Sequence, residues 1–304
     1  MFFRELEQQL GHQRALRIAV AGAQGEEIFS SLRLAEKLGI AQALFIGNPE
    51  EIRRSASRVG MNHYTLQSSK DDAASAQIAV KAVVDGDADL LMKGSISTAL
   101  LLKAVLAEKS LIPPGQLLSH MAIMESPEGR LLGITDGGMN IAPGLNEKRQ
   151  ILQSAVQAFQ FLGRPLPKVA VLAAMEKENP KIPESVVAGE LSRLQDAGKI
   201  HHCIVEGPMA LDLAVNHEAC RMKRFAGKIT GDADILLTPN LSAGNILGKS
   251  LVYLGGWRGG GVVLGAAKPI ILLSRSDSTE EKFNSILLSV ALAAAQNHLS
   301  HSET

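Results

Sequence analysis

Short apolar runs alternate with longer amphipathic segments along almost the whole chain, and this alternation limits the folds open to it. The runs are continuous and rich in valine, isoleucine and leucine, which is typical of parallel strands buried on both faces. The candidate strands are residues 17–22, 43–47, 89–94, 168–174, 202–207, 234–240, 261–266 and 269–274. The amphipathic segments between them include residues 26–38, 71–84, 147–162 and 183–198. The sequence therefore predicts a doubly wound α/β fold with a mostly parallel sheet.

One segment departs from the alternation. Residues 117–125 and 129–136 both have the composition of strands, and only Ser126-Pro127-Glu128 separates them, which predicts a β-hairpin. An antiparallel pair is common in an otherwise parallel sheet. The turn formers GGMNIAPG at residues 137–144 follow the hairpin and indicate a domain boundary there. A length of 304 residues is also typical of about two domains.

A short sequence occurs twice. GDADLL at residues 86–91 returns as GDADIL at residues 231–236, each after a helical segment and before a polar turn. Two similarly built α/β halves explain the repeat. Chance explains it as well, because Gly-Asp turns commonly lead into strands. Both interpretations stay open at this point.

The charge balance excludes two classes of partner. Lys plus Arg and Asp plus Glu both number 31, so the formal net charge is zero. Such a chain has no basic field for nucleic acid and no polybasic arm for anionic lipid. Aromatic residues make up 4% of the sequence, too few for platforms on which single-stranded bases stack. We therefore expect no nucleic-acid partner and no membrane partner.

Targeting signals and cysteines indicate the compartment. The N-terminal sequence reaches Arg4 and Glu5 before an apolar stretch develops, so it does not resemble a signal peptide. No apolar run approaches the roughly 18 residues of a spanning helix. Cys203 and Cys220 cannot form a disulfide framework. These observations predict a soluble, cytoplasmic protein.

Two segments have the composition of phosphate-binding sites. Lys93-Gly94-Ser95 directly follows an apolar strand and opens a helix, so its amides, hydroxyl and cation are able to hold a phosphate. The alternative is an ordinary helix cap with a solvated lysine. AGNILGKS at residues 243–250 fits a loose P-loop pattern, but Ile246 and Leu247 fill the part that must wrap an anion. Its apolar spacing favours a helix instead.

A third segment carries the most chemistry. SRSDSTEE at residues 274–281 lies between a strand and the last helix and brings together hydroxyls, a guanidinium and carboxylates. Arginine suits bidentate phosphate binding, and a nearby carboxylate is able to accept a proton. The alternative for the acids is structural, because Ser278 and Glu281 have the spacing of a capping box. No metal site is expected, since the histidines show no paired ligand spacing and His217 and Cys220, three residues apart, have no second pair to complete a site.

At this point the residues resemble the phosphate acetyl/butyryltransferase family, and most closely its phosphate butyryltransferase branch. The resemblance runs in order over residues 90–286, whereas the first 85 residues fit only as a general α/β pattern. The segments that carry it are LLMKGSISTALLLKAVL (90–106), LLSHMAIME (117–125), ITDGGMNIAPGLNEK (134–148), KVAVLAAMEKENP (168–180), VEGPMALDLAV (205–215), KITGDADILLTPNLSAGNILGKSLVYL (228–254) and KPIILLSRSDSTEEKFNSI (268–286).

The resemblance implies reversible transfer of a short acyl group between coenzyme A and inorganic phosphate, with no bound cofactor. It also implies two doubly wound α/β/α domains with an active-site cleft between them, the second domain inserted in the first. On that plan residues 1–140 and 262–304 form one domain and residues 141–261 the other. Members of the family are commonly homodimers or larger homo-oligomers, so we expect one.

The resemblance also assigns roles to residues. Ser274 and Arg275 match the Ser-Arg pair of the family's site, so Arg275 is expected to bind phosphate and Ser274 the carbonyl or leaving oxygen. Glu281 stands where the acetyl branch has a proposed aspartate base, and Asp277, typical of the butyryl branch, is the competing candidate. The residues expected to bind substrate are Lys93, Thr98 and Asn245.

Two other functions remain to be tested against the structure. Residues 243–250 as a P-loop predict a nucleotide-dependent enzyme such as a kinase. A non-catalytic relative that senses acyl-CoA or acyl phosphate is also compatible with the sequence. The resemblance implies a preferred acyl chain of about three to five carbons. The residues themselves do not indicate the chain length, because one methylene changes selectivity by only about 1–3 kcal/mol.

Overall fold

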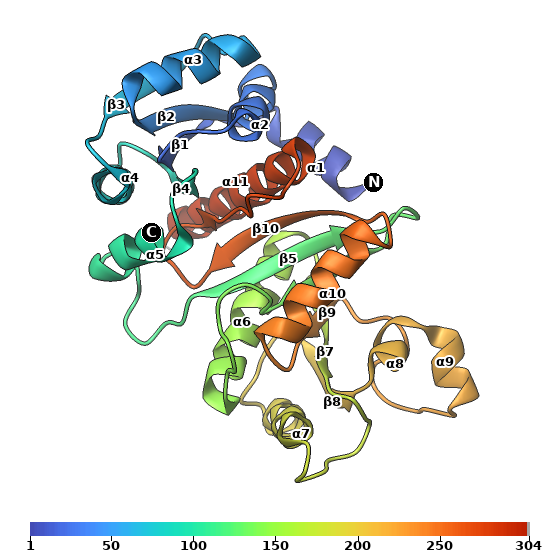
Figure 1. The fold of residues 1–304 in the computed structure, drawn as a ribbon. Coiled ribbons are helices and arrows are strands. Elements are labelled where there is room, and N and C mark those ends of the chain that lie inside the picture. The colour runs from blue at the N-terminus through green and yellow to red at the C-terminus, as the bar shows by residue number, and fades with distance from the viewer. Residues whose placement is uncertain (303–304) are drawn as a thin grey trace. The chain divides into compact units, whose positions relative to one another are not determined.

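The computed structural model describes residues 1–302, with side chains described as far as Gln296. Helices and strands alternate as predicted, and the α/β class is confirmed (Figure 1). The chain forms two compact units. The first consists of Met1–Gln116 and the chain from Gly259 onward, and the second of Leu117–Arg258.

The first unit is built on a mostly parallel set of strands in the order β3-β2-β1-β4-β11-β10. Only β10 runs antiparallel, against β11. Its strands are β1 (Leu16–Ala21), β2 (Ala41–Gly47), β3 (Tyr64–Ser68), β4 (Leu90–Lys93), β10 (Arg258–Leu264) and β11 (Ile270–Ile271). Its helices are α1 (Phe2–Leu10), α2 (Glu26–Lys37), α3 (Pro49–Val59), α4 (Asp72–Val84), α5 (Thr98–Ala107) and α11 (Thr279–Ser302).

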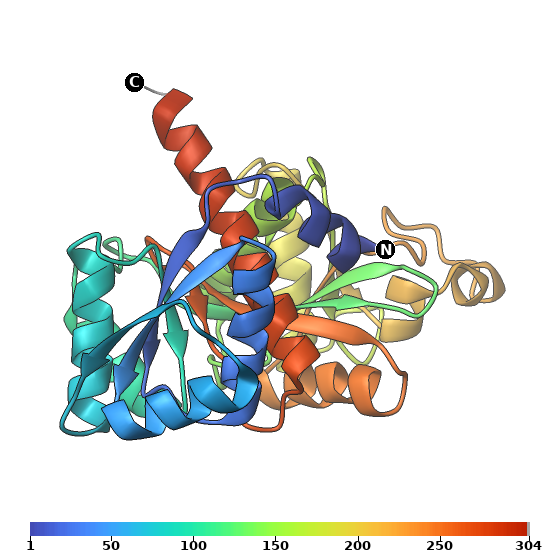
Figure 2. The ribbon, with the colours of Figure 1, turned by 90° about the horizontal axis from the view of Figure 1, so that it is seen from above.

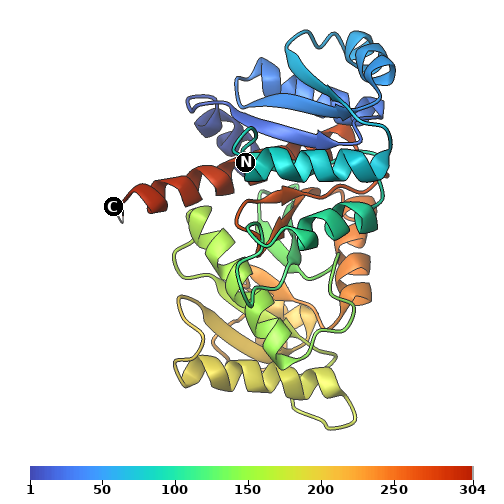
Figure 3. The same cartoon turned by 90° about the vertical axis from the view of Figure 1, so that its left-hand side faces the viewer.

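Helices cover both faces of these strands. Helix α11 packs against α2 and α1, as seen from above in Figure 2. Helices α4 and α5 pack side by side (Figure 3), and α4 contacts β1, β2 and β4. Between the layers the side chains are apolar, and the ring of Phe29 on α2 stacks on that of Phe45 on β2 at 4.4 Å between centroids. The first unit is therefore doubly wound.

The second unit has the strand order β5-β6-β9-β7-β8, in which only the β5–β6 pair is antiparallel. Its strands are β5 (Ser119–Glu125), β6 (Leu131–Thr135), β7 (Lys168–Leu172), β8 (Ile204–Met209) and β9 (Ile235–Leu237). Its helices are α6 (Leu145–Phe161), α7 (Pro183–Asp196), α8 (Leu211–Val215), α9 (His217–Met222) and α10 (Leu241–Tyr253). The predicted hairpin is thus confirmed as β5 and β6.

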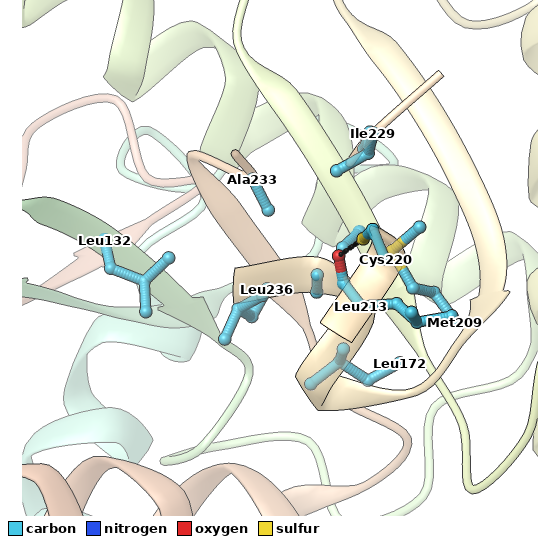
Figure 4. Packing of buried hydrophobic residues seen from close by; sticks show 10 residues of the cluster. Leu132, Leu172, Met209, Leu213, Cys220, Ile229, Ala233 and Leu236 are labelled. Atoms are coloured by element: carbon cyan, nitrogen blue, oxygen red, sulfur yellow. Dashed lines mark hydrogen bonds between the residues drawn. The ribbon is translucent and has the colours of Figure 1, made fainter. Parts of the chain in front are cut away.

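One apolar cluster joins β6, β7 and β9 of this unit to the helices that cover them. The cluster contains Leu132, Leu172 and Leu236 from these strands, together with Met209 at the end of β8 and Leu213 of α8 (Figure 4). In the same cluster the Cys220 thiol donates a hydrogen bond to the carbonyl oxygen of Leu213 at 3.2 Å. Cys203 and Cys220 are both free and buried.

The first unit boundary lies 24 residues before the predicted one, at Gln116 rather than residue 140. The reason is the hairpin, which the sequence analysis assigned to the first domain. Strand β6 pairs in parallel with β9, so Gly133 lies beside Ile235 and the hairpin groups with the second unit. The second boundary, at Arg258, lies within three residues of the predicted 261.

The repeated sequence adopts the same local structure in both units. The Asp89 carboxylate accepts the backbone amide of Arg17 at 2.7 Å, and the Asp234 carboxylate accepts that of Lys168 at 2.8 Å. Each aspartate thereby fastens the start of its own strand to the neighbouring strand. Gly86 and Gly231, which open the two copies, both have positive φ, at 81° and 88°. The glycine and the second aspartate therefore have the same local role in both copies, which agrees with two similarly built halves.

Strand β3 was not predicted, because its residues YTLQS are polar and none is fully buried. Among the described residues no helix is long and apolar enough to span a membrane.

Candidate active site

The strand order of the first unit reverses at β1 and β4. The chain passes from β1 outward to β2 and β3, then returns to β4 on the other side of β1. In doubly wound sheets ligands bind beyond the carboxyl ends of the strands at such a switch point. The loops that leave β1 and β4 here are residues 22–25 and 94–97. The fold alone therefore directs attention to these two loops.

The two loops are packed tightly against each other. A Cβ added at Gly94 would lie far inside van der Waals contact with the Gly22 carbonyl oxygen, so only glycine fits there. The Ser95 hydroxyl donates to that same carbonyl oxygen at 3.0 Å. The sequence analysis did not link residues 22–25 to the Lys93-Gly94-Ser95 segment. Within this turn Gly22 and Gly25 both have positive φ, at 67° and 93°.

Lys93 ends β4 and is 4% exposed. Its Nζ donates to the carbonyl oxygens of Gly94 at 3.2 Å and Ile96 at 3.3 Å. Burial lowers the pKa of this lysine, and the positive charges of Arg275 and Lys282 lower it further, while Asp277 acts in the opposite direction. The lysine is therefore part of the loop's structure and not a solvated cap.

The turn that follows β11 carries the predicted Ser-Arg pair. Ile271 of β11 pairs with Met92 of β4 in parallel, so the turn and Lys93 leave the same edge of the sheet. The Ser274 amide donates to the Asp277 carboxylate at 2.7 Å, and the Ser274 hydroxyl lies 3.0 Å from that of Ser276. These bonds close a compact turn on which Ser274 and Arg275 are exposed. Arg275 makes no hydrogen bond or ion pair with the rest of the described chain.

The first turn of α11 is capped as the spacing predicted. The Glu281 carboxylate accepts the Ser278 amide at 2.8 Å through Oε2, and the Ser278 hydroxyl accepts the Glu281 amide at 3.2 Å. This reciprocal pair is a capping box. It fixes Glu281 directly beside the Ser274–Asp277 turn.

Lys282 is a site residue that the sequence analysis missed. It is 3% exposed, and its Nζ donates to the carbonyl oxygen of Asp277. The only sequence signal was a lysine eight residues beyond Ser274, at the start of a helix whose following turns are apolar. Lys93, Arg275 and Lys282 thus place three cations around one turn.

Of the two remaining predicted residues, Thr98 begins a helix and Asn245 lies within one. Thr98 begins α5, directly after Ser97, whose hydroxyl caps that helix by accepting the Leu100 amide at 3.2 Å. Asn245 belongs to the second unit, where its side-chain amide donates to the Gly137 carbonyl oxygen at 3.3 Å. The structure therefore brings Ser274, Arg275, Asp277, Glu281 and Lys93 together and places Thr98 in the same unit. It leaves Asn245 in the other.

Asn245 lies within a second polar cluster, at the carboxyl ends of β6 and β9. A Cβ at Gly137 would lie 2.7 Å from the Gly244 backbone, so the two segments approach as closely as glycine allows. The Thr238 hydroxyl donates to the Asp136 carbonyl oxygen at 3.1 Å. Lys148, 2% exposed, donates to the Thr238 carbonyl oxygen at 3.3 Å, and burial lowers its pKa to about 8.

The P-loop alternative does not fit the structure. Residues 243–250 lie inside α10, so their amides donate along the helix rather than around an anion. Across the described part of the chain, no three histidine, cysteine, aspartate or glutamate side chains gather closely enough to hold a metal ion.

Comparison with known proteins gives consistent results. Residues 57–290 match the model of the family described as "Phosphate acetyl/butaryl transferase". The protein of Bacillus subtilis named "Probable phosphate butyryltransferase" is 41% identical, over 92% of this chain and 94% of its own. The phosphate butyryltransferase of Clostridium acetobutylicum is 38% identical, over 96% and 98%. The crystal structure of a branched-chain phosphotransacylase from Enterococcus faecalis superposes with a TM-score of 0.83 at 37% identity, covering 91% of this chain and 99% of that one.

Proposed function

The chain belongs to the phosphate acetyl/butyryltransferase family, and on this premise we propose that it transfers a short acyl group reversibly between coenzyme A and inorganic phosphate. The observation that carries the proposal is the exposed Ser274–Arg275 pair on the turn beside the buried Lys93. A guanidinium without a protein partner, next to a second cation, suits an oxyanion. In the direction that forms acyl phosphate, the two substrates are acyl-CoA and phosphate.

Arg275 and Lys93 are proposed to bind the phosphate. Arg275 is able to place two N–H groups on two phosphate oxygens. Lys93 adds a positive charge, which solvent screens only weakly because the side chain is buried. Together they hold a phosphate oxygen next to the thioester carbonyl carbon. Holding the reactants in this way removes much of the entropic cost of a reaction between two substrates.

The bond changes then balance without a further reactant. A phosphate oxygen attacks the carbonyl carbon, and the carbonyl oxygen becomes an oxyanion in the tetrahedral intermediate. The Ser274 hydroxyl, exposed on the turn, is proposed to donate to this oxyanion or to the leaving atom. The C–S bond breaks, the acyl phosphate forms, and the coenzyme A thiolate takes up the proton that the attacking hydrogen phosphate gives up. In the reverse direction the thiol must lose that proton, and a free thiol has a pKa near 8.5.

For this proton we propose Glu281 as the base and Asp277 as the residue that holds the turn. Glu281 uses Oε2 for the helix cap, while Oε1 accepts no hydrogen bond from any described residue. Asp277 instead directs its carboxylate inward, to the Ser274 amide. On this proposal Glu281 is the base and Asp277 has a structural role, whereas the resemblance left both as candidates for the base.

The acyl group is proposed to be short, of the butyryl type and straight or branched. Support comes from the butyryltransferase relatives and from the branched-chain phosphotransacylase structure. Thr98 and Asn245 are proposed to bind substrate as well, on the family resemblance. The two structural units are proposed to act as the two domains that the resemblance implies.

Three further parts of the proposal come from the family resemblance and from the sequence. We propose a homodimer or larger homo-oligomer, a cytoplasmic location, and catalysis without a bound cofactor. Sedimentation equilibrium tests the first, and cell fractionation the second. Activity of extensively dialysed enzyme in EDTA tests the third.

The experiment that tests the function measures release of free coenzyme A from acyl-CoA. Acetyl-, propionyl-, butyryl-, isobutyryl- and octanoyl-CoA are compared, each with phosphate, without phosphate, and with EDTA. We expect release that requires phosphate, that EDTA does not reduce, and that is fastest with the four-carbon chains. Binding of coenzyme A without release from any substrate would contradict the proposal and indicate a sensor.

A further inference from the structure

Lys282 occupies a position that helix electrostatics disfavours. It is the fourth residue of α11, within the turn where unpaired amides carry partial positive charge. Anions are stabilised there and cations are not. Glu280 and Glu281, immediately before it, follow the usual preference. Stability of the helix alone therefore does not account for the lysine.

Burial adds to the free-energy cost of placing a positive charge at this position. The Lys282 side chain is 3% exposed, and its Nζ donates a hydrogen bond to a backbone carbonyl oxygen rather than to a carboxylate. The charge is met by one carbonyl oxygen, that of Asp277. Lys93, the other buried lysine of the site, is likewise met by carbonyl oxygens only. A buried cation without a counterion costs free energy unless something else offsets it.

What Lys282 holds is the turn that presents the Ser-Arg pair. Its ammonium binds the Asp277 carbonyl oxygen, and the carboxylate of the same Asp277 binds the Ser274 amide. The Ser274 carbonyl oxygen in turn accepts the Asp277 amide at 3.3 Å. A continuous chain of hydrogen bonds thus runs from Lys282 through Asp277 to Ser274.

We infer that Lys282 is a positioning residue, which holds the Ser274–Asp277 turn and supplies buried positive charge behind the anion that Arg275 and Lys93 bind. The inference rests on the proposed function, which it extends to a residue outside the Ser-Arg pair. It does not place Lys282 in contact with substrate. A bound phosphate would offset the cost of the two buried lysines, because its charge is opposite to theirs.

The test compares Lys282→Met with two other variants. Methionine keeps an unbranched, buried side chain but removes the charge, and Lys282→Arg keeps the charge. Asn284→Ala is the matched control, because Asn284 is 3% exposed on the same helix and fastens it through a 3.2 Å bond to the Gly259 carbonyl oxygen. Each variant is assayed for kcat, for the KM of phosphate and of butyryl-CoA, and for Tm.

We expect Lys282→Met to raise the KM of phosphate about 10-fold or more, the scale of one lost charged hydrogen bond, and to lower kcat. The KM of butyryl-CoA should stay within about twofold of wild type, because the substitution changes only the anion site. Lys282→Arg should recover much of the loss. Asn284→Ala should lower Tm without changing the KM of phosphate.

Equal phosphate kinetics in Lys282→Met and Asn284→Ala would overturn the inference, since the lysine would then be only structural. If Lys282→Met does not fold, Lys282→Gln, which removes the charge but keeps a hydrogen-bond donor, decides. A wild-type Tm with a raised KM of phosphate supports positioning, and a lowered Tm with unchanged kinetics overturns it. If wild type shows no phosphate-dependent release, the proposed function fails separately. Calorimetric titration with inorganic phosphate then tests the anion site, and binding that Lys282→Met leaves unchanged overturns the inference.

Discussion

The backbone amide of Ser274 donates a 2.7 Å hydrogen bond to the carboxylate of Asp277, three residues further along the chain. The acid thus serves the turn on which Ser274 and Arg275 are exposed. An amide oxygen can accept the same hydrogen bond, whereas a methyl group cannot. The role of Asp277 is therefore separable from that of a base by choice of substitution.

We expect Asp277→Asn to retain activity within about threefold of wild type and Asp277→Ala to lose about 10-fold or more, because only alanine removes the acceptor. Steady-state kcat/KM for phosphate, with butyryl-CoA saturating, is the measurement. Equal, large losses in both variants would instead identify Asp277 as the proton acceptor.

Glu281 gives the complementary case. Glu281→Gln keeps an oxygen for the Ser278 amide but cannot accept a proton, so Tm should stay near that of wild type. The rate from acyl phosphate and coenzyme A should fall about 100-fold or more, the typical contribution of a general base. Ser278→Ala is the control, since it breaks the cap and leaves the carboxylate. If Ser278→Ala loses as much activity as Glu281→Gln, the carboxylate acts only as a cap.

Arg275 is the residue on which phosphate binding depends most. Replacement by alanine should lower kcat/KM for phosphate about 100-fold or more, because two charged hydrogen bonds are lost together. Arg275→Lys should recover little of it, since an ammonium cannot make the bidentate contact. The exposed side chain makes no hydrogen bond or ion pair with a described residue, so Tm should stay close to that of wild type. Near-normal turnover of the alanine variant would remove Arg275 from the proposed site.

The sheet could be predicted from the sequence because its strands are short, continuous apolar runs, and because segments with the apolar spacing of amphipathic helices separate them. Strand β3 could not, since an edge strand with polar residues lacks that signal. The apolar spacing of residues 243–250 predicted the helix α10 but not which of its apolar side chains are buried. Leu247 and Leu251 pack against the apolar cluster as expected, whereas Ile246 and Leu254 are 65% and 86% exposed.

The site shows the same division. Ser274, Arg275 and Glu281 are close in sequence, so their spacing already predicted one turn and one helix cap. Lys93 is about 180 residues away, and only the pairing of β4 with β11 brings it to the same edge. Lys282 carried no pattern at all, because its importance comes from burial and from one carbonyl contact, neither of which a single sequence contains.

Close packing at Gly94 predicts a loss of stability. Gly94→Ala would drive a methyl group into the Gly22 carbonyl oxygen, and we expect the free energy of unfolding to fall by about 2 kcal/mol or more. Gly248→Ala is the matched control, because Gly248 lies within α10 with no atom near its absent Cβ. That change should raise the free energy of unfolding by about 0.5–1 kcal/mol through helix propensity. Urea unfolding measures both, and similar values for the two would contradict the close approach.

Lys148 predicts how stability depends on pH. Burial lowers its folded-state pKa to about 8 from 10.5, so between these two values the unfolded chain binds more protons than the folded one. The free energy of unfolding must therefore rise with pH across this window, and the cost of the buried charge is present in full below it. Lys148→Met removes the titrating group but keeps an unbranched side chain. We expect wild type to gain stability relative to Lys148→Met between about pH 8 and 10.5, measured by urea unfolding at each pH. Parallel curves for the two proteins would show that the ammonium is charged in the folded state throughout that range.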